Sequence, residues 1–263
     1  LLIDLLKPDY KLITTNKKSS NLFSKFGGIP DVSKDFNWPY FNEKPLSFLF
    51  QLDLSEINVS KIDKNILEDG ILYFFLNIET NDSYEKKGNF KVIYNKKNLK
   101  HLTNEILFKN NIRPIFFKEA FVDFIESYSL PSYQDFQILE LEREHHVNLF
   151  DSIDETRAFI INKCGFEQLP DHQLFGNSNA IQGTVNFHWS LNLLRLNYPL
   201  GKEEILHAQS IENRLSLILQ IDLTDENLDF SSLIHDGMLY FGIANEELLE
   251  NNFDKSLLIS QCT

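Results

Sequence analysis

Alternating apolar and polar positions mark two similar strands that lie far apart in the chain. Residues 46–54 read LSFLFQLDL and residues 215–223 read LSLILQIDL. In the first segment every second residue is apolar, which predicts one continuous apolar face on a strand. That face comprises Leu46, Phe48, Phe50, Leu52 and Leu54. The opposite face carries Gln51 and Asp53, and the second segment repeats the division.

A second pair of matching segments follows these strands in the same order. Residues 69–76 read DGILYFFL and residues 236–243 read DGMLYFGI. An Asp-Gly pair favours a turn because glycine adopts positive φ without steric cost, and the apolar run behind it predicts a strand buried on both faces. Two matches in one order indicate an internal duplication. We therefore expect a first lobe over residues 1–130 and a second over 166–263.

Further elements are expected between the two copies. Strands are predicted at 90–94 and 114–117, with another ending near 127–131. Helices are predicted at 132–147 with Ser132 as the N-cap, from Ser152 to a stop at Gly165, and at 184–196. Residues 131–165 then form a helical insertion. The predicted fold class is β-rich α+β, with internally duplicated antiparallel sheets in a two-lobed single domain and a few peripheral helices.

Charge is unevenly distributed along the chain. Residues 1–118 contain 18 Lys and Arg against 14 Asp and Glu, whereas residues 119–263 contain 7 against 24. The acidic C-terminal part repels phosphate backbones and attracts basic proteins, so we expect no nucleic-acid partner and a basic protein as a candidate partner. An ordinary solvated surface is the alternative explanation.

The remaining composition favours a cytoplasmic protein. No apolar run reaches the length of a membrane span, and no export signal is visible, so no membrane association is expected. The two cysteines, Cys164 and Cys262, are far apart and form no CxxC pair, which is typical of a reducing compartment. The sequence leaves the oligomeric state open.

Standard catalytic signatures are absent from the sequence. It has no Walker loop, no HExxH, no GxSxG and no CxxC, and Gly27-Gly28 is too short to hold a phosphate and indicates a turn. No cofactor is therefore predicted, and the balance leans away from an enzyme.

Asp53 and Asp222 are the strongest candidates for chemistry. Each follows a glutamine by two positions, Gln51 and Gln220, and a twofold relation between the copies would bring the carboxylates into one cleft. Paired carboxylates share a proton or hold a divalent cation, with the glutamines as further oxygen ligands. The alternative is that each Asp caps the turn that follows its strand.

Aromatic and histidine residues offer further candidates. Trp38 and Tyr40 suit the wall of a ligand pocket, with core packing as the alternative. His172 stands in a loop-like segment where it either lines a pocket or hydrogen-bonds to backbone. Glu142 and His145 are one helical turn apart, but one such pair is weak evidence for a metal.

The ordered motifs resemble a known family. They are FGGIP at 26–30, WP at 38–39, PLSFLFQLDL at 45–54, DGILYFF at 69–75, HQLFG at 172–176, IQG at 181–183, LQID at 219–222, DGMLYF at 236–241 and LISQC at 258–262. Together they resemble the YwqG-like family of bacterial proteins over nearly the whole chain. The resemblance implies a duplicated α+β protein of unknown function, and it carries over no catalytic residue. Family members often have Trp-Gly where Ile234-His235 stands here.

The sequence is compatible with three functions. The first is a non-enzymatic binding protein that engages a basic protein through its acidic C-terminal surface, in one version an immunity protein that neutralises a basic bacterial toxin. The second is a metal-dependent hydrolase with Asp53 and Asp222 at its centre. The third is a small-molecule-binding protein with its site between the duplicated lobes.

Overall fold

One large antiparallel sheet organises the molecule. The computed structural model describes residues 2–15, 23–63, 66–79, 83–96, 102–103, 108–165, 170–230, 233 and 237–262. Ten strands of this part of the chain form the sheet. In sheet order they are β14 (Leu257–Cys262), β13 (Gly237–Ala244), β12 (Leu215–Asp222), β11 (Gln173–Leu174), β1 (Lys7–Thr15), β10 (Ala120–Ser129), β2 (Lys25–Phe26), β6 (Ser47–Asp53), β7 (Ile71–Leu76) and β8 (Phe90–Asn95).

Smaller elements complete the fold. Two short sheets pair β3 (Val32–Ser33) with β9 (Leu102–Thr103) and β4 (Tyr40–Phe41) with β5 (Lys44–Pro45). The α-helices of the described residues are α1 (Phe136–His145), α2 (Phe150–Cys164), α3 (Val185–Leu194), α4 (Lys202–Ser210) and α5 (Asn245–Leu249). The 3₁₀ turns include η2 (Leu54–Glu56) and η6 (Glu212–Arg214). No helix among the described residues is long and apolar enough to cross a membrane.

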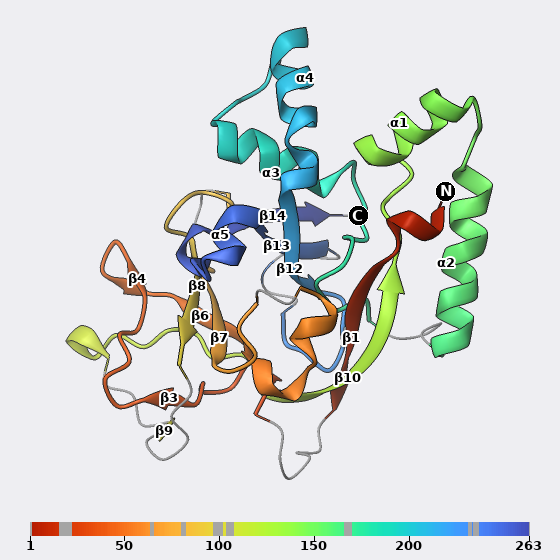
Figure 1. Ribbon diagram of the computed structural model, residues 1–263. Coiled ribbons are helices and arrows are strands. Elements are labelled where there is room, and N and C mark those ends of the chain that lie inside the picture. The colour runs from red at the N-terminus through yellow and green to blue at the C-terminus, as the bar shows by residue number, and fades with distance from the viewer. Residues whose placement is uncertain are drawn as a thin grey trace.

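The sheet has a pseudo-twofold axis at its centre. β1 and β10 pair along their whole length and run side by side through the middle of the molecule (Figure 1). β11 pairs with β1 as β2 pairs with β10, and three longer strands follow on each side. The register places the axis at the pair Ile13 and Asp123. We call β2, β6, β7 and β8 the first half and β11, β12, β13 and β14 the second half.

This architecture confirms the predicted β-rich α+β class, and the duplication extends to small details. The same register shift interrupts β6 between Phe48 and Phe50 and β12 between Leu217 and Leu219. Such a bulge adds one unpaired residue and reverses the alternation of side chains. The prediction of one apolar face from Leu46 to Leu54 is therefore wrong, because Leu46 and Phe48 lie in a different cluster from Phe50, Leu52 and Leu54.

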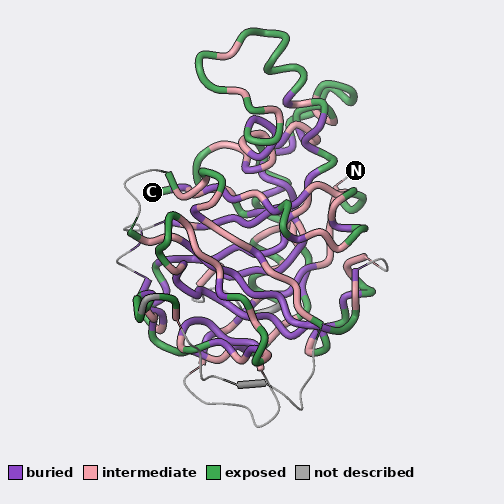
Figure 2. Tube along the Cα trace, turned by 90° about the vertical axis from the view of Figure 1, so that its left-hand side faces the viewer, coloured by how far each residue is buried: buried purple, intermediate pink, exposed green. Residues whose placement is uncertain are grey.

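The main core lies where the two halves face each other. The sheet curves until Phe74 of β7 meets Phe241 of β13, with ring centroids 5.1 Å apart. Leu52, Leu72, Leu219 and Leu239 belong to the same cluster. Figure 2 shows that the crossing strands of the body are buried along most of their length. This burial of apolar area is the main source of stability for the fold.

Each half also buries its outer face. Trp38 and its neighbours cover the outer face of β6 and β7, whereas α3 places Trp189 over β12 and β13. The sheet is thus apolar on both faces. This explains why the apolar residues that follow each of the two Asp-Gly turns form a continuous run.

The helical segment differs in detail from its prediction. α1 begins at Phe136 with Asp135 as its N-cap, and the Asp135 carboxylate accepts a hydrogen bond from Ser132 N in the turn before the helix. α2 begins at Phe150, two residues before Ser152. Residues 114–117 form no strand. Both helices lie beside β1 and β10 (Figure 1), and α3 and α4 project at the top of the view.

A candidate ligand site at the junction of the two halves

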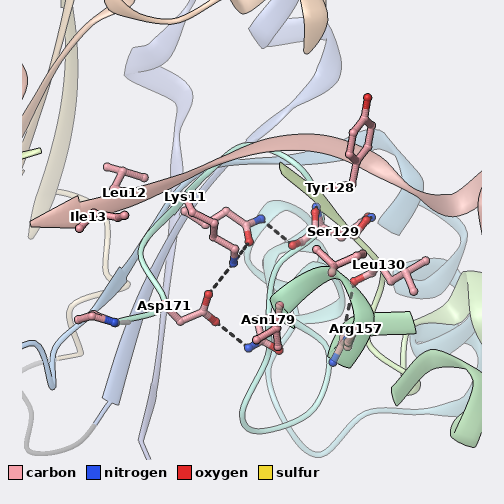
Figure 3. A pocket seen from close by; sticks show the side chains of 14 residues that line it. Lys11, Leu12, Ile13, Tyr128, Ser129, Leu130, Arg157, Asp171 and Asn179 are labelled. Atoms are coloured by element: carbon pink, nitrogen blue, oxygen red, sulfur yellow. Dashed lines mark hydrogen bonds and ion pairs between the residues drawn. The ribbon is translucent and has the colours of Figure 1, made fainter. Parts of the chain in front are cut away.

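A cavity of about 240 Å³ opens where β1, the end of β10, α2 and residues 170–179 meet. Figure 3 shows the side chains that converge on it. The lining residues are Lys11, Leu12, Ile13, Tyr128, Ser129, Leu130, Arg157, Ile160, Ile161, Pro170, Asp171, Gln173, Asn177 and Asn179. The cavity therefore lies beside the pseudo-twofold axis, on the side of the second half.

A hydrogen-bonded polar network forms one wall. Lys11 stands opposite Gln173 in the pairing of β1 with β11, which brings it close to the loop before β11. Its Nζ donates to Asp171 Oδ1 at 2.6 Å and to Gln173 Oε1 at 2.7 Å. Asn179 Nδ2 donates to the other carboxylate oxygen of Asp171 at 2.6 Å (Figure 3). These polar side chains are fixed in place before any ligand arrives.

The electrostatics of Asp171 follow from this network. Burial alone raises the pKa of a carboxyl group because the charged form loses its hydration. The charge of Lys11 and the hydrogen bonds from Lys11 and Asn179 outweigh burial here, so the pKa of Asp171 lies below its ordinary value. Asp171 is therefore an anion at neutral pH, and it compensates the charge of Lys11.

Arg157 of α2 also lines the cavity. Its Nη2 donates to the carbonyl oxygens of Leu130 at 3.2 Å and Pro131 at 3.0 Å. Burial lowers the pKa of Arg157, and the nearby carboxylates of Asp135 and Asp171 oppose that effect. The guanidinium remains charged, since its ordinary pKa is far above neutral pH. Within the described residues, its Nε and Nη1 have no hydrogen-bond acceptor.

A buried carboxylate lies behind the polar wall. Asp9, two residues before Lys11 on β1, is only 1% exposed, and neither carboxylate oxygen has a hydrogen-bond partner among the described residues. Burial raises the pKa of Asp9 to about 6, against the charge of Lys11 and the nearby Ser129 and Ser127 hydroxyls. Both hydroxyls lie close to the carboxylate without reaching hydrogen-bond geometry. Asp9 is therefore a destabilised anion at neutral pH.

A second buried carboxyl group lies near Asp135. Glu212 in η6 is 4% exposed, and burial together with repulsion from Asp135 raises its pKa to about 8. Burial also raises the pKa of Asp135 to about 6, although Ser132 N and the charges of Arg157 and Lys7 act in the opposite direction. Buried groups with shifted pKa values gather at functional sites more often than elsewhere. The junction is the part of the molecule where several of them meet.

The predicted pair Asp53 and Asp222 occupies equivalent positions in the two halves. Asp53 Oδ1 accepts hydrogen bonds from Ser55 N at 3.1 Å and Ser55 Oγ at 2.6 Å. Asp222 Oδ1 accepts from Thr224 N at 2.9 Å and Thr224 Oγ1 at 2.7 Å. Each carboxylate thus caps the turn after its strand, which is the alternative that the sequence also suggested.

The two glutamines hold the loops in front of their strands. Gln51 Oε1 accepts from Asp31 N and Gln220 Oε1 accepts from Asn179 N, both at 2.9 Å. Their cross-strand neighbours, Tyr73 and Tyr240, belong to the outer clusters of the two halves. No hydrogen bond among the described residues joins one pair to the other, and no group of three potential metal ligands occurs among them. A cation at Asp53 and Asp222 stays a prediction.

The predicted pocket aromatics lie elsewhere. Trp38 is buried in the outer cluster of the first half and donates from Nε1 to Leu46 O at 2.9 Å, while Tyr40 packs against that cluster. His172 is fully buried: its Nδ1 accepts from Asp222 N at 3.0 Å and its Nε2 lies 3.1 Å from Asp225 Oδ2. None of the three lines the junction cavity.

A second cavity of about 440 Å³ lies between residues 62–63, β12 and α5. Two of its polar side chains, Ser216 and Asn245, are already engaged with protein groups, whereas Lys7 forms no hydrogen bond or ion pair with a described residue. Ser216 donates to Asn245 Oδ1 at 2.7 Å, and Asn245 donates to Asn213 O at 3.2 Å. The junction cavity is the better candidate because an apolar wall and several charged side chains held by hydrogen bonds meet in it.

Comparison with known proteins places the chain in a family. Residues 24–262 match the family described as a domain of unknown function, DUF1963. The chain belongs to this family. The matched region runs from β2 to β14 and so includes both halves, α2 and the segment 170–179. No curated protein matches the chain. The finer YwqG-like assignment stays a prediction.

The sequence does not predict the cavity of this DUF1963 domain, because the residues that line it are far apart along the chain. Lys11, Arg157 and Asp171 come from three distant segments, and only the pairing of β1 with β11 unites two of them. One signal was available: residues 24–28 and 172–176 hold equivalent positions before the two repeats. They share only their last glycine, so the match is faint in sequence. The family's departure at Ile234-His235, and Asp236 of the second turn, lie outside the described residues.

Proposed function

We propose that this DUF1963 protein binds a small molecule in the junction cavity. The observation that supports the proposal is a cavity that combines an apolar wall with charged side chains held in fixed positions. Leu130, Ile160 and Ile161 supply apolar surface, and Lys11 and Asp171 supply the fixed polar groups. Ligand sites of proteins have this composition: mostly apolar, with a few well-placed polar groups.

Preorganisation favours binding over a purely structural role. Asp171 is held by Lys11 and Asn179, and Arg157 is anchored by two backbone carbonyls. A ligand that meets groups already in place loses less conformational entropy on binding. The volume of about 240 Å³ is slightly below the range of about 300–1,000 Å³ for drug-sized ligands, so the ligand is small.

A cavity-filling variant tests this function. Ile160→Trp places a bulky ring in the cavity, whereas Phe159→Trp, one residue earlier on α2, adds the same ring at a position that is 61% exposed and lines neither cavity. Both variants and the parent protein are titrated by calorimetry with a panel of small anionic, neutral and cationic amphiphiles. We expect Ile160→Trp to abolish binding and Phe159→Trp to retain it.

Two results would count against ligand binding at the junction. One is a panel in which no compound binds the parent protein. The other is unchanged affinity in folded Ile160→Trp protein, because the occupant would then lie outside the cavity. Circular dichroism and the unfolding midpoint establish that each variant is folded before it is titrated.

A second candidate function rests on the surface of the helical segment. α1 and α2 present exposed carboxylates that form no ion pair among the described residues; these are Glu140, Glu144, Asp151, Asp154 and Glu155. Such a surface accelerates association with a basic protein. We therefore retain the proposal of a basic protein partner, in one version a bacterial toxin that this protein neutralises.

Charge reversal on these helices tests the protein-partner proposal. A Glu144→Lys, Glu155→Lys double variant is compared with the parent protein for binding to any basic toxin encoded beside it. We expect binding that weakens with salt and falls in the double variant. Salt-independent binding, or equal binding by both proteins, would refute a role for the acidic surface.

A further inference from the structure

The geometry points to a ligand with a single anionic headgroup, a carboxylate, bound by Arg157 and followed by a short apolar tail. This inference rests on the proposed function and specifies the chemical class of its ligand. It comes from the charges that face the cavity, the donors that Arg157 leaves unused, and the apolar residues beside them.

The charges around the cavity leave one cation without a contact partner. Lys11 and Asp171 form an ion pair at 2.6 Å. Arg157 is partly exposed and forms no ion pair with any described residue, although Asp135, Asp154 and Asp171 lie near enough to oppose the lowering of its pKa by burial. Because no carboxylate of the described residues contacts the guanidinium, an anion placed against its free N–H groups gains charge-assisted hydrogen bonds.

The anchoring of Arg157 orients the guanidinium for such a headgroup. Nη2 is held by the carbonyls of Leu130 and Pro131, which fixes the plane of the group. The N–H groups of Nε and Nη1 remain without acceptors among the described residues. The N–H groups of Nε and Nη1 point to different sides of the guanidinium, so each offers a single charge-assisted hydrogen bond to an anionic oxygen.

The helix places apolar surface next to this headgroup site. Ile160 and Ile161 follow Arg157 by three and four residues on α2, so all three side chains lie on one face of the helix. Leu130 lies over Arg157 (Figure 3). Tyr128 and Ile161, which also line the cavity, are 57% and 39% exposed and lie at its rim. An apolar tail that starts at Arg157 is thus covered by these residues.

Asp171 restricts the headgroup to a monoanion. Its carboxylate lines the same cavity and lies near enough to affect the pKa of Arg157. A dianion such as a phosphate monoester would gain one cation and suffer repulsion from Asp171. A cationic headgroup would meet the opposite difficulty at Arg157. A carboxylate of short to medium chain length fits both the charge and the volume.

Three probes of equal chain length test the class on the unmodified protein. Octanoate, octanamide and octylamine share one tail and differ in the charge of the headgroup. We expect calorimetry to give an affinity for octanoate about tenfold or more above that for octanamide, in line with the strength of hydrogen bonds to charged groups, and no measurable binding of octylamine.

Variants of Arg157 locate the headgroup. In Arg157→Gln the affinity for octanoate should fall to that for octanamide, while octanamide itself binds as before. Arg143→Gln, an exposed position on α1, is the matched control and should retain the preference for octanoate. If Arg157→Gln does not fold, Arg157→Lys takes its place, since it keeps the charge but loses the oriented Nε and Nη1 donors and should reduce the preference for octanoate.

The outcomes separate this inference from the function on which it rests. Equal affinity for the three probes, or an Arg157→Gln protein that keeps the preference, overturns the carboxylate assignment. If Ile160→Trp still blocks those probes, binding at the junction stands. No binding of any probe or of the wider panel overturns both.

Discussion

The two halves share one hydrogen-bonded frame but differ in the charges placed on it. In the first half Lys25 lies 3.3 Å from Asp31 and 2.8 Å from Glu119. Lys25 pairs with Gln51 as Gln173 pairs with Gln220, so Gln173 is its equivalent. A cation between two carboxylates in one half thus corresponds to a neutral amide in the other.

The partner carboxylates can be matched in the same way. A Cβ added at Gly28 would lie 2.7 Å from Glu119 Oε2, and one added at Gly176 would lie 2.8 Å from Asp9 Cβ. Asp9 is therefore the counterpart of Glu119. Glu119 has Lys25 beside it, whereas Asp9 has no lysine at the equivalent position. The second half instead receives its cation from β1, where Lys11 replaces the counterpart Phe121. The two halves thus keep the same strand pairing while their charged residues differ, and the cavity lies in the half where the charged residues have changed position.

The outer clusters differ by volume instead of charge. Trp38 packs on Phe75 with ring centroids 5.0 Å apart, whereas Trp189 lies directly over Gly242, the equivalent residue of β13. One tryptophan therefore rests on a ring and the other on bare backbone. Single substitutions in each half separate these differences.

Phe75→Ala should have the largest effect. It removes a fully buried ring that contacts Trp38 and Phe48, and such truncations cost about 3–5 kcal/mol through lost burial and the remaining cavity. Urea unfolding monitored by circular dichroism measures the change. Phe159→Ala, at an exposed position on α2, should change the free energy of unfolding by about 0.5 kcal/mol or less. Equal effects at both sites would contradict the packing described here.

Asp9→Asn should stabilise the protein at neutral pH. The pKa of Asp9 is about 6 in the folded protein and ordinary in the unfolded chain, so the folded state binds the proton more tightly. Stability therefore falls as pH rises from the ordinary Asp value through 6, by up to about 3 kcal/mol. Removing the charge should recover much of this loss at pH 7 and flatten the pH dependence between about 4 and 6.

Glu119→Gln is the control in the other half, because Glu119 has Lys25 beside it. It should not stabilise the protein at pH 7. A destabilised Asp9→Asn protein would mean that the Asp9 carboxylate has partners in solution that compensate its burial.

Gly242→Ala should cost about 1–3 kcal/mol. The added Cβ would lie 2.5 Å from Trp189 Cε2, so the ring must move within a packed cluster. Trp189→Phe provides space, and the double variant should be more stable than the sum of the two single changes predicts. Additive effects, measured by urea unfolding, would indicate that the ring does not rest on Gly242.

The coupling between Lys11 and Asp171 should be the smallest effect, about 1 kcal/mol, because both side chains are partly exposed to water. A double-mutant cycle with Lys11→Met and Asp171→Asn measures it. Since the pKa of Asp171 is lowered in the folded protein, the coupling should be present above the ordinary pKa of Asp and lost as pH falls through the folded value. A coupling unchanged at low pH would contradict the ion pair.

The duplication was predictable because it is expressed locally. The strand and turn patterns of residues 46–54 and 69–76 recur at 215–223 and 236–243, and alternation plus turn chemistry suffices to interpret them. The bulges in β6 and β12 could not be predicted from the sequence, because a strand with one extra apolar residue has the same apolar character as a strand without it. Residues 7–15 show no clear strand pattern in the sequence either, because β1 lies in a part of the sheet where polar and apolar residues are covered on both faces.

The candidate site was less predictable for a physical reason. Asp53 and Asp222 attract attention because they repeat, yet the repeat reflects a shared structural task at equivalent turns. Arg157 and Lys11 occur once each, in segments without a counterpart of the same chemistry. Their meeting depends on sheet order, which local sequence patterns do not encode.

The central position of β1 also sets the order in which the sheet can assemble. β1 pairs with β10, more than 100 residues later, and with β11, about 160 residues later. During synthesis on the ribosome its edges therefore stay unpaired until those distant strands emerge. Contacts of such long range slow folding, because loop closure costs entropy before the pairing is gained. Early hydrogen-exchange protection should thus appear within β6 and β7 or β12 and β13, and β1 should be protected last.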